Sequence, residues 1–258
     1  MRAEILTDPD MMIRGARMIE ALIAASPIPI TPSVRYTGTA DLLVTYGTGH
    51  PLRRQWLQRH RASGRHCIGL DLGYWGADTM RVTIDTDHPP QWIQTEDPSR
   101  WDSQGIQLRN EFNPKGHAVI VGMGRKSLTV HGLRPLEWEA RAVNIAKSMG
   151  LTPLLKTKRA NYAGLPGVAT AKGSMEEALK GAALVICRHS NAAVDACIAG
   201  VPVICEDGAA LALYRGNPSP SVDQRLEFLR SLAWWNYRID EAALCWTYLL
   251  SRLRSASI

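Results

Sequence analysis

Three apolar stretches in the second half of the chain are each followed directly by polar and mostly cationic residues. HAVIV precedes residues 122–127, LTPLL precedes residues 156–159, and ALVIC precedes residues 188–191. Two glycines of the first loop, Gly122 and Gly124, let backbone N–H groups approach a phosphate without a Cβ in the way. Cationic side chains and the N–H groups at a helix start attract the same anion. Together these loops predict a site for a diphosphate.

The residues expected to contact this diphosphate and its nucleoside come from these loops and from the segments after them. Ser190 or Asn191 would cap the following helix, and Asp195, about one turn further on, could reach a ribose hydroxyl. Glu206, at the end of the apolar stretch VPVIC, is the alternative for the ribose. The full set is Gly122, Gly124, Arg125, Lys126, Ser127, Lys158, Arg159, His189, Ser190, Asn191, Asp195 and Glu206.

Each of these motifs also has an ordinary structural explanation. The loop GMGRKS lacks the glycine spacing of a dinucleotide-binding GxGxxG loop and of a P-loop. The KTKR turn fits a solvated surface loop, and Ser-Asn is a common helix cap that needs no ligand. The functional interpretation is favoured because all three loops are expected at the same end of one sheet.

Groups able to exchange protons are found at the predicted strand ends of the first half. We expect Asp71 to act as a general base, because it ends an apolar strand in LDLGYW, where a carboxylate needs a reason to be. His88 is the second catalytic candidate, since histidine titrates near neutral pH. Asp85, Asp87 and His50 are further candidates. Asp71 has an equally plausible structural role as a turn residue bonded to its own backbone, and His50 fits a helix cap better.

The stretch HPLRRQWLQRHRASGRH is predicted to form a basic helix, with arginines at 53, 54, 59, 61 and 65 and Trp56 among them. Beside a cleft, such a helix could follow a DNA backbone. Trp75 and Trp92 could stack on an extruded base. The residues expected to contact the acceptor are Arg53, Arg54, Tyr74 and Trp75. The alternative is a solvated helix face with Trp56 in the core.

Hydrophobic patterning places the candidate residues of the first half at strand ends. The predicted order is a strand, a helix over residues 10–25, a strand, the basic helix and two further strands. Such alternation favours a mostly parallel sheet with helices on both faces. Residues 87–113 lose periodicity and gather proline, aspartate and tryptophan, so we expect a linker there.

A second alternation of strands and helices runs from HAVIV to VPVIC. The tail over residues 222–253 is expected to be helical, with Leu226, Leu229, Leu232 and Trp235 near one face. Two successive α/β units predict two Rossmann-like domains, in which ligands bind at the carboxyl ends of the parallel strands.

Composition sets broad limits on the class of protein. With 258 residues, 45% of them hydrophobic and 21% charged, the chain reads as globular and has room for two small domains. No apolar run approaches the roughly 18 residues that cross a bilayer. The scattered cysteines lack the spacing of a zinc site and fit buried thiols in the cytoplasm. A formal charge of +6 favours an anionic partner.

The second half resembles the donor domain of GT-B glycosyltransferases, in particular small ones encoded by tailed bacteriophages. The resemblance covers residues 116–250 and extends weakly into the first half through LDLGYW and IDTDHP. The helix closed by Gly200-Val-Pro202 is also similar to the donor-site segment of non-hydrolysing UDP-GlcNAc 2-epimerases. The stretches that carry the likeness are VIVGMGRKS, LEWEARAVNIAK, LLKTKR, ALVICRHSNAAVDACIAGVPVIC and RLEFLRSLAWWNYRIDEAALCWTYLL.

The resemblance implies an α/β fold of two Rossmann-like domains facing a cleft, with the C-terminal helix crossing back to the first domain. The implied parts are an acceptor-side domain over residues 1–113, a nucleotide-sugar domain over 114–221, and helices at the junction over 222–258. The donor would be a nucleotide-diphosphate sugar, UDP-linked by preference. The acceptor would be a hydroxyl of a hydroxymethylated base in phage DNA, or of a glycan, a lipid-linked sugar or a protein. A phage-encoded enzyme of this kind would act in the host cytoplasm. Such enzymes usually need no metal and no cofactor.

Two other functions stay open at this stage. A non-catalytic module could keep the fold and bind nucleic acid or protein through its basic surface. A nucleotide-sugar epimerase or phosphorylase would share the donor site; an epimerase would need no acceptor. Binding of a nucleoside diphosphate separates the first of these from the enzymes.

Overall fold

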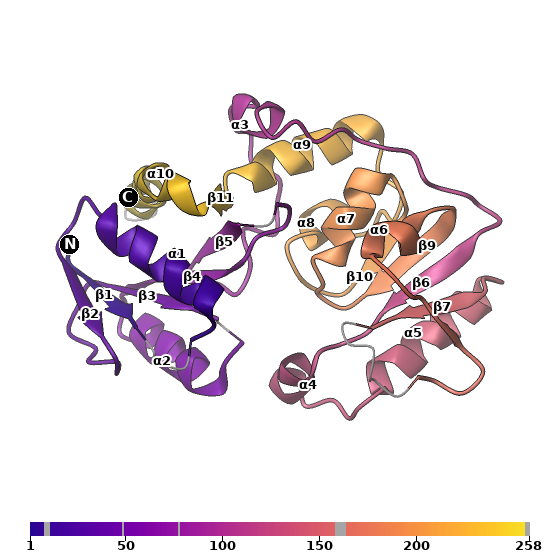
Figure 1. Ribbon diagram of the computed structural model, residues 1–258, viewed down its shortest axis with the longest axis horizontal. Helices are drawn as coiled ribbons and strands as arrows, with labels where there is room; N and C mark the ends of the chain where they lie inside the picture. The colour runs from indigo at the N-terminus through magenta and orange to yellow at the C-terminus, as the bar shows by residue number, and fades with distance from the viewer. Residues whose placement is uncertain (8–10, 48, 77, 158–163, 256–258) are drawn as a thin grey trace. The chain divides into compact units, whose positions relative to one another are not determined.

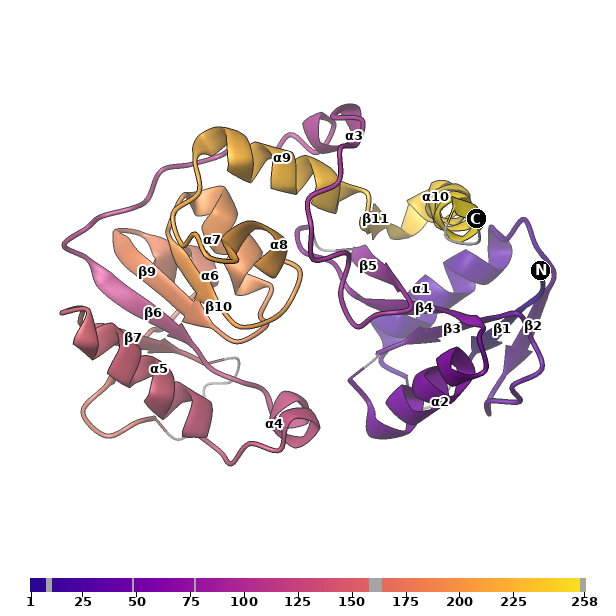
Figure 2. The same ribbon diagram turned by 180° about the vertical axis from the view of Figure 1, so that it is seen from behind.

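The first and last parts of the chain fold together. One unit comprises Met1–Pro89 and Leu232–Ile258, and the other comprises Pro90–Ser231. Each unit has its own β-sheet, which can be followed from opposite sides in Figures 1 and 2. The predicted α/β fold with two Rossmann-like domains is therefore confirmed. The structure is a computed structural model that describes residues 1–7, 11–47, 49–76, 78–157 and 164–255.

The segment expected to be a linker associates with the second unit. Backbone N–H of Arg109 donates to the carbonyl of Ile198 over 2.8 Å, and that of Glu111 donates to Ala199 over 2.8 Å. The first segment of the first unit therefore ends at Pro89, whereas the sequence placed this limit at residue 113.

The sheet of the first unit mixes parallel and antiparallel strands. Its order is β11-β5-β4-β3-β1-β2, in which β2, β1, β3 and β4 are parallel and β5 and β11 are antiparallel to their neighbours. Residues 73–78 join β4 to β5 and are too few for the crossover that a parallel neighbour requires. The strands are β1 (Ala3–Leu6), β2 (Ile30–Ser33), β3 (Leu42–Tyr46), β4 (His66–Leu72), β5 (Thr79–Ile84) and β11 (Asn236–Arg238).

Helices cover both faces of this sheet. α1 (Ile13–Ala24) and α10 (Ala242–Ser255) pack on one face, and α2 (Pro51–Ala62) packs on the other. Successive strand residues point to opposite faces of the sheet. Ile5 belongs to the core cluster with α1 and α10, and Leu6 belongs to the cluster with α2.

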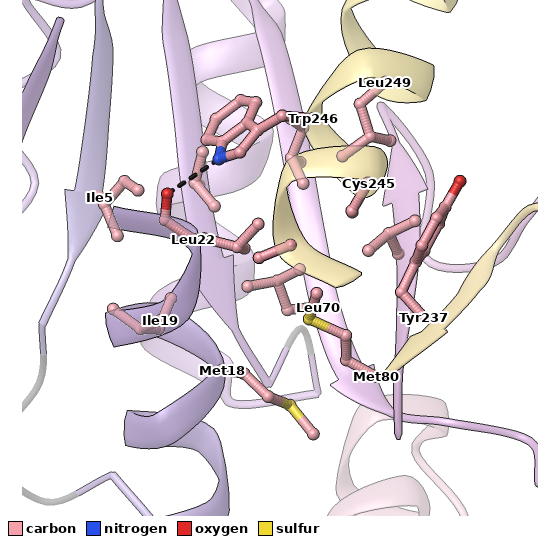
Figure 3. Packing of buried hydrophobic residues seen from close by; sticks show 14 of the residues in the cluster. Ile5, Met18, Ile19, Leu22, Leu70, Met80, Tyr237, Cys245, Trp246 and Leu249 are labelled. Carbon is pink, nitrogen blue, oxygen red and sulfur yellow. Dashed lines mark hydrogen bonds between the residues drawn. The ribbon is translucent and has the colours of Figure 1, made fainter. Parts of the chain in front are cut away.

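The last helix is a structural part of the first unit. Trp246 of α10 is fully buried, and its indole Nε1 donates a hydrogen bond to the carbonyl of Leu22 on α1 over 2.8 Å (Figure 3). Met18, Ile19 and Leu22 form the buried stripe of α1. Met12, just before the helix, is 61% exposed.

The sequence predicted a helical tail over residues 222–253. In the structure a strand and a 3₁₀ turn divide it into two helices. α9 (Val222–Ala233) ends before β11, and a 3₁₀ turn (Ile239–Glu241) precedes α10. Strand β11 forms because β5 offers an unpaired edge, and Val82 N–H donates to the carbonyl of Trp235 over 2.9 Å. Asn236 adds a side-chain bond, accepting from the N–H of Tyr74 over 2.8 Å.

The sheet of the second unit is entirely parallel, in the order β10-β9-β6-β7-β8. All its described strands therefore have their carboxyl ends at one edge. The strands are β6 (His117–Val121), β7 (Pro153–Lys156), β8 (Ala169–Thr170), β9 (Ala182–Cys187) and β10 (Val203–Cys205). The helices are α3 (Ser99–Asp102), α4 (Arg125–His131), α5 (Glu137–Ser148), α6 (Met175–Leu179), α7 (Ala192–Ala199), α8 (Leu211–Tyr214) and most of α9.

Small residues bring α7 close to this sheet. Ala192, Ala193, Ala196 and Ala199 are all buried. The helix ends at Gly200, whose φ of 77° is strained for residues with a side chain. A Cβ there would also lie 2.6 Å from the carbonyl oxygen of Arg109.

Candidate functional site

Residues from separate strand exits meet at the carboxyl edge of the second sheet. The Ser127 hydroxyl on α4, which follows β6, lies 3.0 Å from Nε2 of His189 at the end of β9. His131, one turn after Ser127, places its ring centroid 5.2 Å from that of His189. The exits of β6 and β9, about 60 residues apart in sequence, are thus joined by side chains, as the sequence predicted from topology.

An ion-pair network links the exits of β9 and β10. Arg188 Nε lies 3.3 Å from one carboxylate oxygen of Glu206, and Arg141 of α5 lies 3.2 Å from the other. The guanidinium of Arg141 also lies over the Trp138 ring, 5.6 Å from its centroid. Because both of its oxygens are paired with arginines, Glu206 is better placed to orient Arg188 than to bind a ribose.

The glycine loop after β6 is held by backbone and side-chain bonds. Gly122 N–H donates to the carbonyl of Lys156 over 2.9 Å, and Met123 N–H donates to Oε1 of Glu139 over 2.7 Å. A Cβ at position 122 would lie 3.4 Å from that carboxylate oxygen. A Cβ at Gly124, the N-cap residue of α4, would have no atom within 4 Å. The helix has only 7 residues and is too short for its dipole to bind an anion.

Glu139 is a site residue that the sequence interpretation missed. Its side chain is buried, with 1% of the residue exposed, and its Oε2 has no hydrogen-bond partner in the described part of the chain. A signal was present: Glu139 falls on the buried stripe of α5 with Ala142, Val143 and Ala146. A carboxylate in such a position has a specific partner in most proteins, here the glycine loop.

The start of α7 is capped by Ser190. Its Oγ accepts a hydrogen bond from Ala192 N–H over 3.2 Å, whereas Asn191 at the N-cap position makes no side-chain cap bond. Burial raises the pKa of Asp195 to about 6, and the nearby positive charge of Arg109 lowers it in part. Arg109 itself pairs with Glu176 on α6, so Asp195 lies beside the α6 side of the helix.

The other described cations of the predicted loops lie on α4 and at the end of β7. Arg125 and Lys126 are exposed on the first turn of α4, next to Ser127. Lys156 donates to the carbonyl of Gly173. Lys158 and Arg159 lie outside the described residues.

In the first unit, Asp71 is tied into its own sheet. One carboxylate oxygen accepts from Arg81 of β5 over 3.1 Å, and the other accepts from the N–H of Leu72 over 2.8 Å. Tyr74 is buried, and the Arg81 guanidinium lies 5.9 Å from its ring centroid. Burial raises the pKa of Tyr74 to about 12, with Arg81 acting in the opposite direction. Tyr74 therefore belongs to the core, while Trp75 is half-buried.

Asp85 lies at the other end of β4 from Asp71. Because β5 is antiparallel, its last residues face the start of β4, where Asp85 bonds the Cys67 N–H over 2.7 Å and His66 Nδ1 over 2.6 Å. Its φ of 56° fits this capping role in a turn. Asp85 therefore follows the carboxyl end of β5, as expected, but lies at the opposite edge of the sheet from the carboxyl ends of the parallel strands. His88 follows three residues later, and its carbonyl accepts from Thr86; its catalytic role stays a prediction.

Every arginine of the basic α2 region contacts its own unit. Arg53 donates to the Tyr46 carbonyl over 2.8 Å, and Arg54 pairs with Asp87 over 2.9 Å. Arg61 bonds the carbonyl of Asp85, Arg65 bonds that of Ala40, and Arg59 lies over the Tyr36 ring. Trp56 stacks with Tyr36, and His50 occupies the N-cap position without a side-chain cap bond. The charge of this helix is thus largely used within the fold.

The described residues contain no group of three or more His, Cys, Asp or Glu side chains placed to hold a metal ion. A metal-independent reaction stays a prediction. No helix in the described ranges has the length and apolarity needed to cross a membrane.

Known proteins resemble this chain in fold. No protein-family model matches the sequence, and no curated protein matches it. Among solved structures, the β Kdo 2,4 transferase of Thermosulfurimonas dismutans KpsC matches with a TM-score of 0.57 and 11% identity, over 92% of each chain. The β Kdo 2,7 transferase of the same KpsC matches with a TM-score of 0.57 and 13% identity, over 97% of this chain and 98% of that one. The chain therefore has the two-domain Rossmann-like fold of GT-B type seen in these transferases.

Proposed function

We propose that this chain is a glycosyltransferase that moves a sugar from a nucleotide-diphosphate sugar, UDP-linked by preference, to an acceptor hydroxyl. The observation that carries the proposal is the meeting of Ser127, His189, Arg188 and Glu206 from three exits of one parallel sheet. The fold shared with the KpsC transferases along nearly the whole chain supports it.

Sugar transfer requires the chain to supply a base and to stabilise the leaving diphosphate. In the transfer step the acceptor oxygen bonds to the anomeric carbon, the bond from that carbon to the diphosphate oxygen breaks, and a base takes the hydroxyl proton. The leaving diphosphate gains negative charge, which Arg188, the predicted Lys158 and Arg159, and the N–H groups after Ser190 would stabilise. We propose Asp71 as the base, oriented by Arg81.

Two classes of acceptor are compatible with the proposed transfer. A hydroxymethylated base in phage DNA remains one candidate, with Trp75 and the exposed Trp92 available for stacking. The internal bonding of the α2 arginines favours a smaller acceptor, because these side chains already have partners. A sugar hydroxyl on a glycan, as the names of the KpsC transferases suggest, is the candidate that we favour.

The test is a transfer assay with two variants. The full chain is incubated with labelled nucleotide sugars, including a UDP series and an activated Kdo donor, together with glycan acceptors and hydroxymethylated DNA. Arg159→Ala should weaken UDP binding severely, whereas Asp71→Ala should spare binding and lower turnover. Absence of transfer and of donor hydrolysis across the panel, together with absence of UDP binding, would favour the non-catalytic alternative. Interconversion of two nucleotide sugars without an acceptor would favour an epimerase.

A further inference from the structure

Two histidines from different elements lie together at the carboxyl edge of the second sheet. The ring of His131, on the last turn of α4, has its centroid 5.2 Å from the ring of His189, in the loop between β9 and α7. Ser127, four residues before His131 and so on the same side of α4, lies 3.0 Å from His189 Nε2. All three residues are partly exposed, although the Nδ1 atom of His189 is itself buried.

Cations outnumber free carboxylates on the described elements around this pair. Both oxygens of Glu206 are engaged by Arg141 and Arg188, and Asp207 accepts from Gln91 over 3.0 Å. The charged groups on these elements are Arg125 and Lys126 on α4, Arg188 at the β9 exit, Glu206 and Asp207 at the β10 exit, Glu137, Glu139, Arg141 and Lys147 on α5, and Asp195 on α7, the helix after His189.

We propose that His131 and His189, with the Ser127 hydroxyl, bind one tetrahedral oxyanion, and that they bind it more tightly as the pH falls. The shared chemistry is that of a phosphate or sulfate group. Identification of this oxyanion with a phosphate of the donor rests on the proposed function, whereas oxyanion binding itself does not.

Proton linkage follows from the geometry of the pair. Two imidazolium rings at this separation repel one another, and the neighbouring arginines add to the repulsion, so protonation of both is unfavourable in the free protein. A dianion against the rings reverses that preference and draws protons onto them. Binding therefore takes up protons, and affinity rises as the pH falls through the range in which histidine titrates, around pH 6.5.

The Ser127 bond adds a directional element. When His189 Nε2 carries no hydrogen, the Ser127 hydroxyl must donate to it. When Nε2 is protonated, it becomes the donor and the Ser127 oxygen the acceptor. The hydroxyl hydrogen is then available to the oxyanion, so protonation at Nε2 frees one additional donor.

Sulfate is the probe for the test, because it stays a dianion throughout the pH range of histidine titration. Calorimetric titration of the full chain with sulfate should show roughly tenfold tighter binding near pH 5.5 than near pH 8, with proton uptake that differs between buffers of different ionisation enthalpy. His131→Asn and His189→Asn should each weaken sulfate binding at low pH and flatten the profile. His117→Asn is the matched control, because His117 bonds the Ala178 carbonyl at the opposite edge of the same sheet.

Several results would overturn the proposal. One is sulfate affinity in the unaltered chain that does not change with pH; another is the same pH profile in His131→Asn or His189→Asn as in His117→Asn. If the histidine variants do not fold, proton uptake by the unaltered chain decides: none on sulfate binding refutes the proposal. Inorganic phosphate and UDP form the other arms. Competition between UDP and sulfate supports the donor assignment, whereas sulfate binding with proton uptake but no sugar transfer leaves this inference standing and removes only the proposed function.

Discussion

The carboxyl ends of the strands are used differently in the two units. In the second unit the parallel neighbours β9 and β6 end at one edge, and Ser127 contacts His189 there. In the first unit β5 runs against β4, so Asp85 is bonded at the opposite end of the sheet from Asp71, and Asp71 pairs with Arg81 within the sheet. A parallel sheet gathers side chains from distant parts of the sequence, whereas a mixed sheet separates them.

The largest expected effect concerns the role of the last helix. If α10 is a structural layer of the first unit, Trp246→Ala should lower the free energy of unfolding by about 3–5 kcal/mol, since a buried indole and its bond to Leu22 are lost. Denaturant unfolding measures this loss. Leu244→Ala, on an exposed face of the same helix, should change stability by less than about 0.5 kcal/mol. Equal losses in both variants would show that α10 is not packed as described.

A second prediction compares one arginine from each unit. Arg188→Ala should weaken UDP binding roughly 10- to 100-fold, because a charged hydrogen bond to a phosphate contributes about 1.5–3 kcal/mol. Arg54→Ala, which removes the partner of Asp87 in the first unit, should leave UDP affinity within about twofold. Isothermal titration gives both values. The contrast between the units fails if Arg54→Ala has the larger effect.

Glu139 tests whether the glycine loop needs its buried support. Glu139→Ala removes the acceptor of the Met123 N–H and should weaken UDP binding by about tenfold, while Glu139→Gln keeps an acceptor oxygen and should restore most of it. The control is Glu137→Ala, two residues earlier on α5, where the side chain pairs with Arg134. Its UDP affinity should stay close to that of the parent. A purely structural role would lower stability without this order of UDP affinities.

The smallest expected effect concerns Asp195, whose carboxylate is buried without an ion pair among the described residues. Burial raises its pKa to about 6 in the folded chain, above the ordinary value of 3.8, so the folded state holds a proton that the unfolded chain releases between these values. Stability therefore falls as the pH rises through this window. Asp195→Asn should be more stable than the parent by about 1 kcal/mol near pH 7.5, and the difference should vanish below about pH 4.

Thermal or denaturant unfolding at several pH values measures the Asp195 effect. Asp223→Asn, at an exposed position on α9, is the matched control and should show no such window. A variant less stable than the parent at pH 7.5 would mean that the Asp195 carboxylate has a stabilising partner in the folded chain.

Local pattern was enough to predict many parts of this protein. The apolar stretches ending at Val121, Cys187 and Cys205 form strands, the helix of small residues packs closely against its sheet, and polar residues follow each of these strands. These features depend on the period of hydrophobic residues and on glycine and cap positions, which are properties of short segments. The two Rossmann-like units follow from the order of those segments.

Only the tertiary structure decided which of these segments are neighbours and in which direction they run. In the structure β5 runs antiparallel to β4, and the tail expected to be helical contains β11. Met1–Pro89 folds together with Leu232–Ile258. The tertiary structure also placed Glu139 beneath the glycine loop and His131 beside His189. Strand direction and side-chain encounters of this kind depend on contacts between residues far apart in the chain, and no short stretch of sequence contains that information.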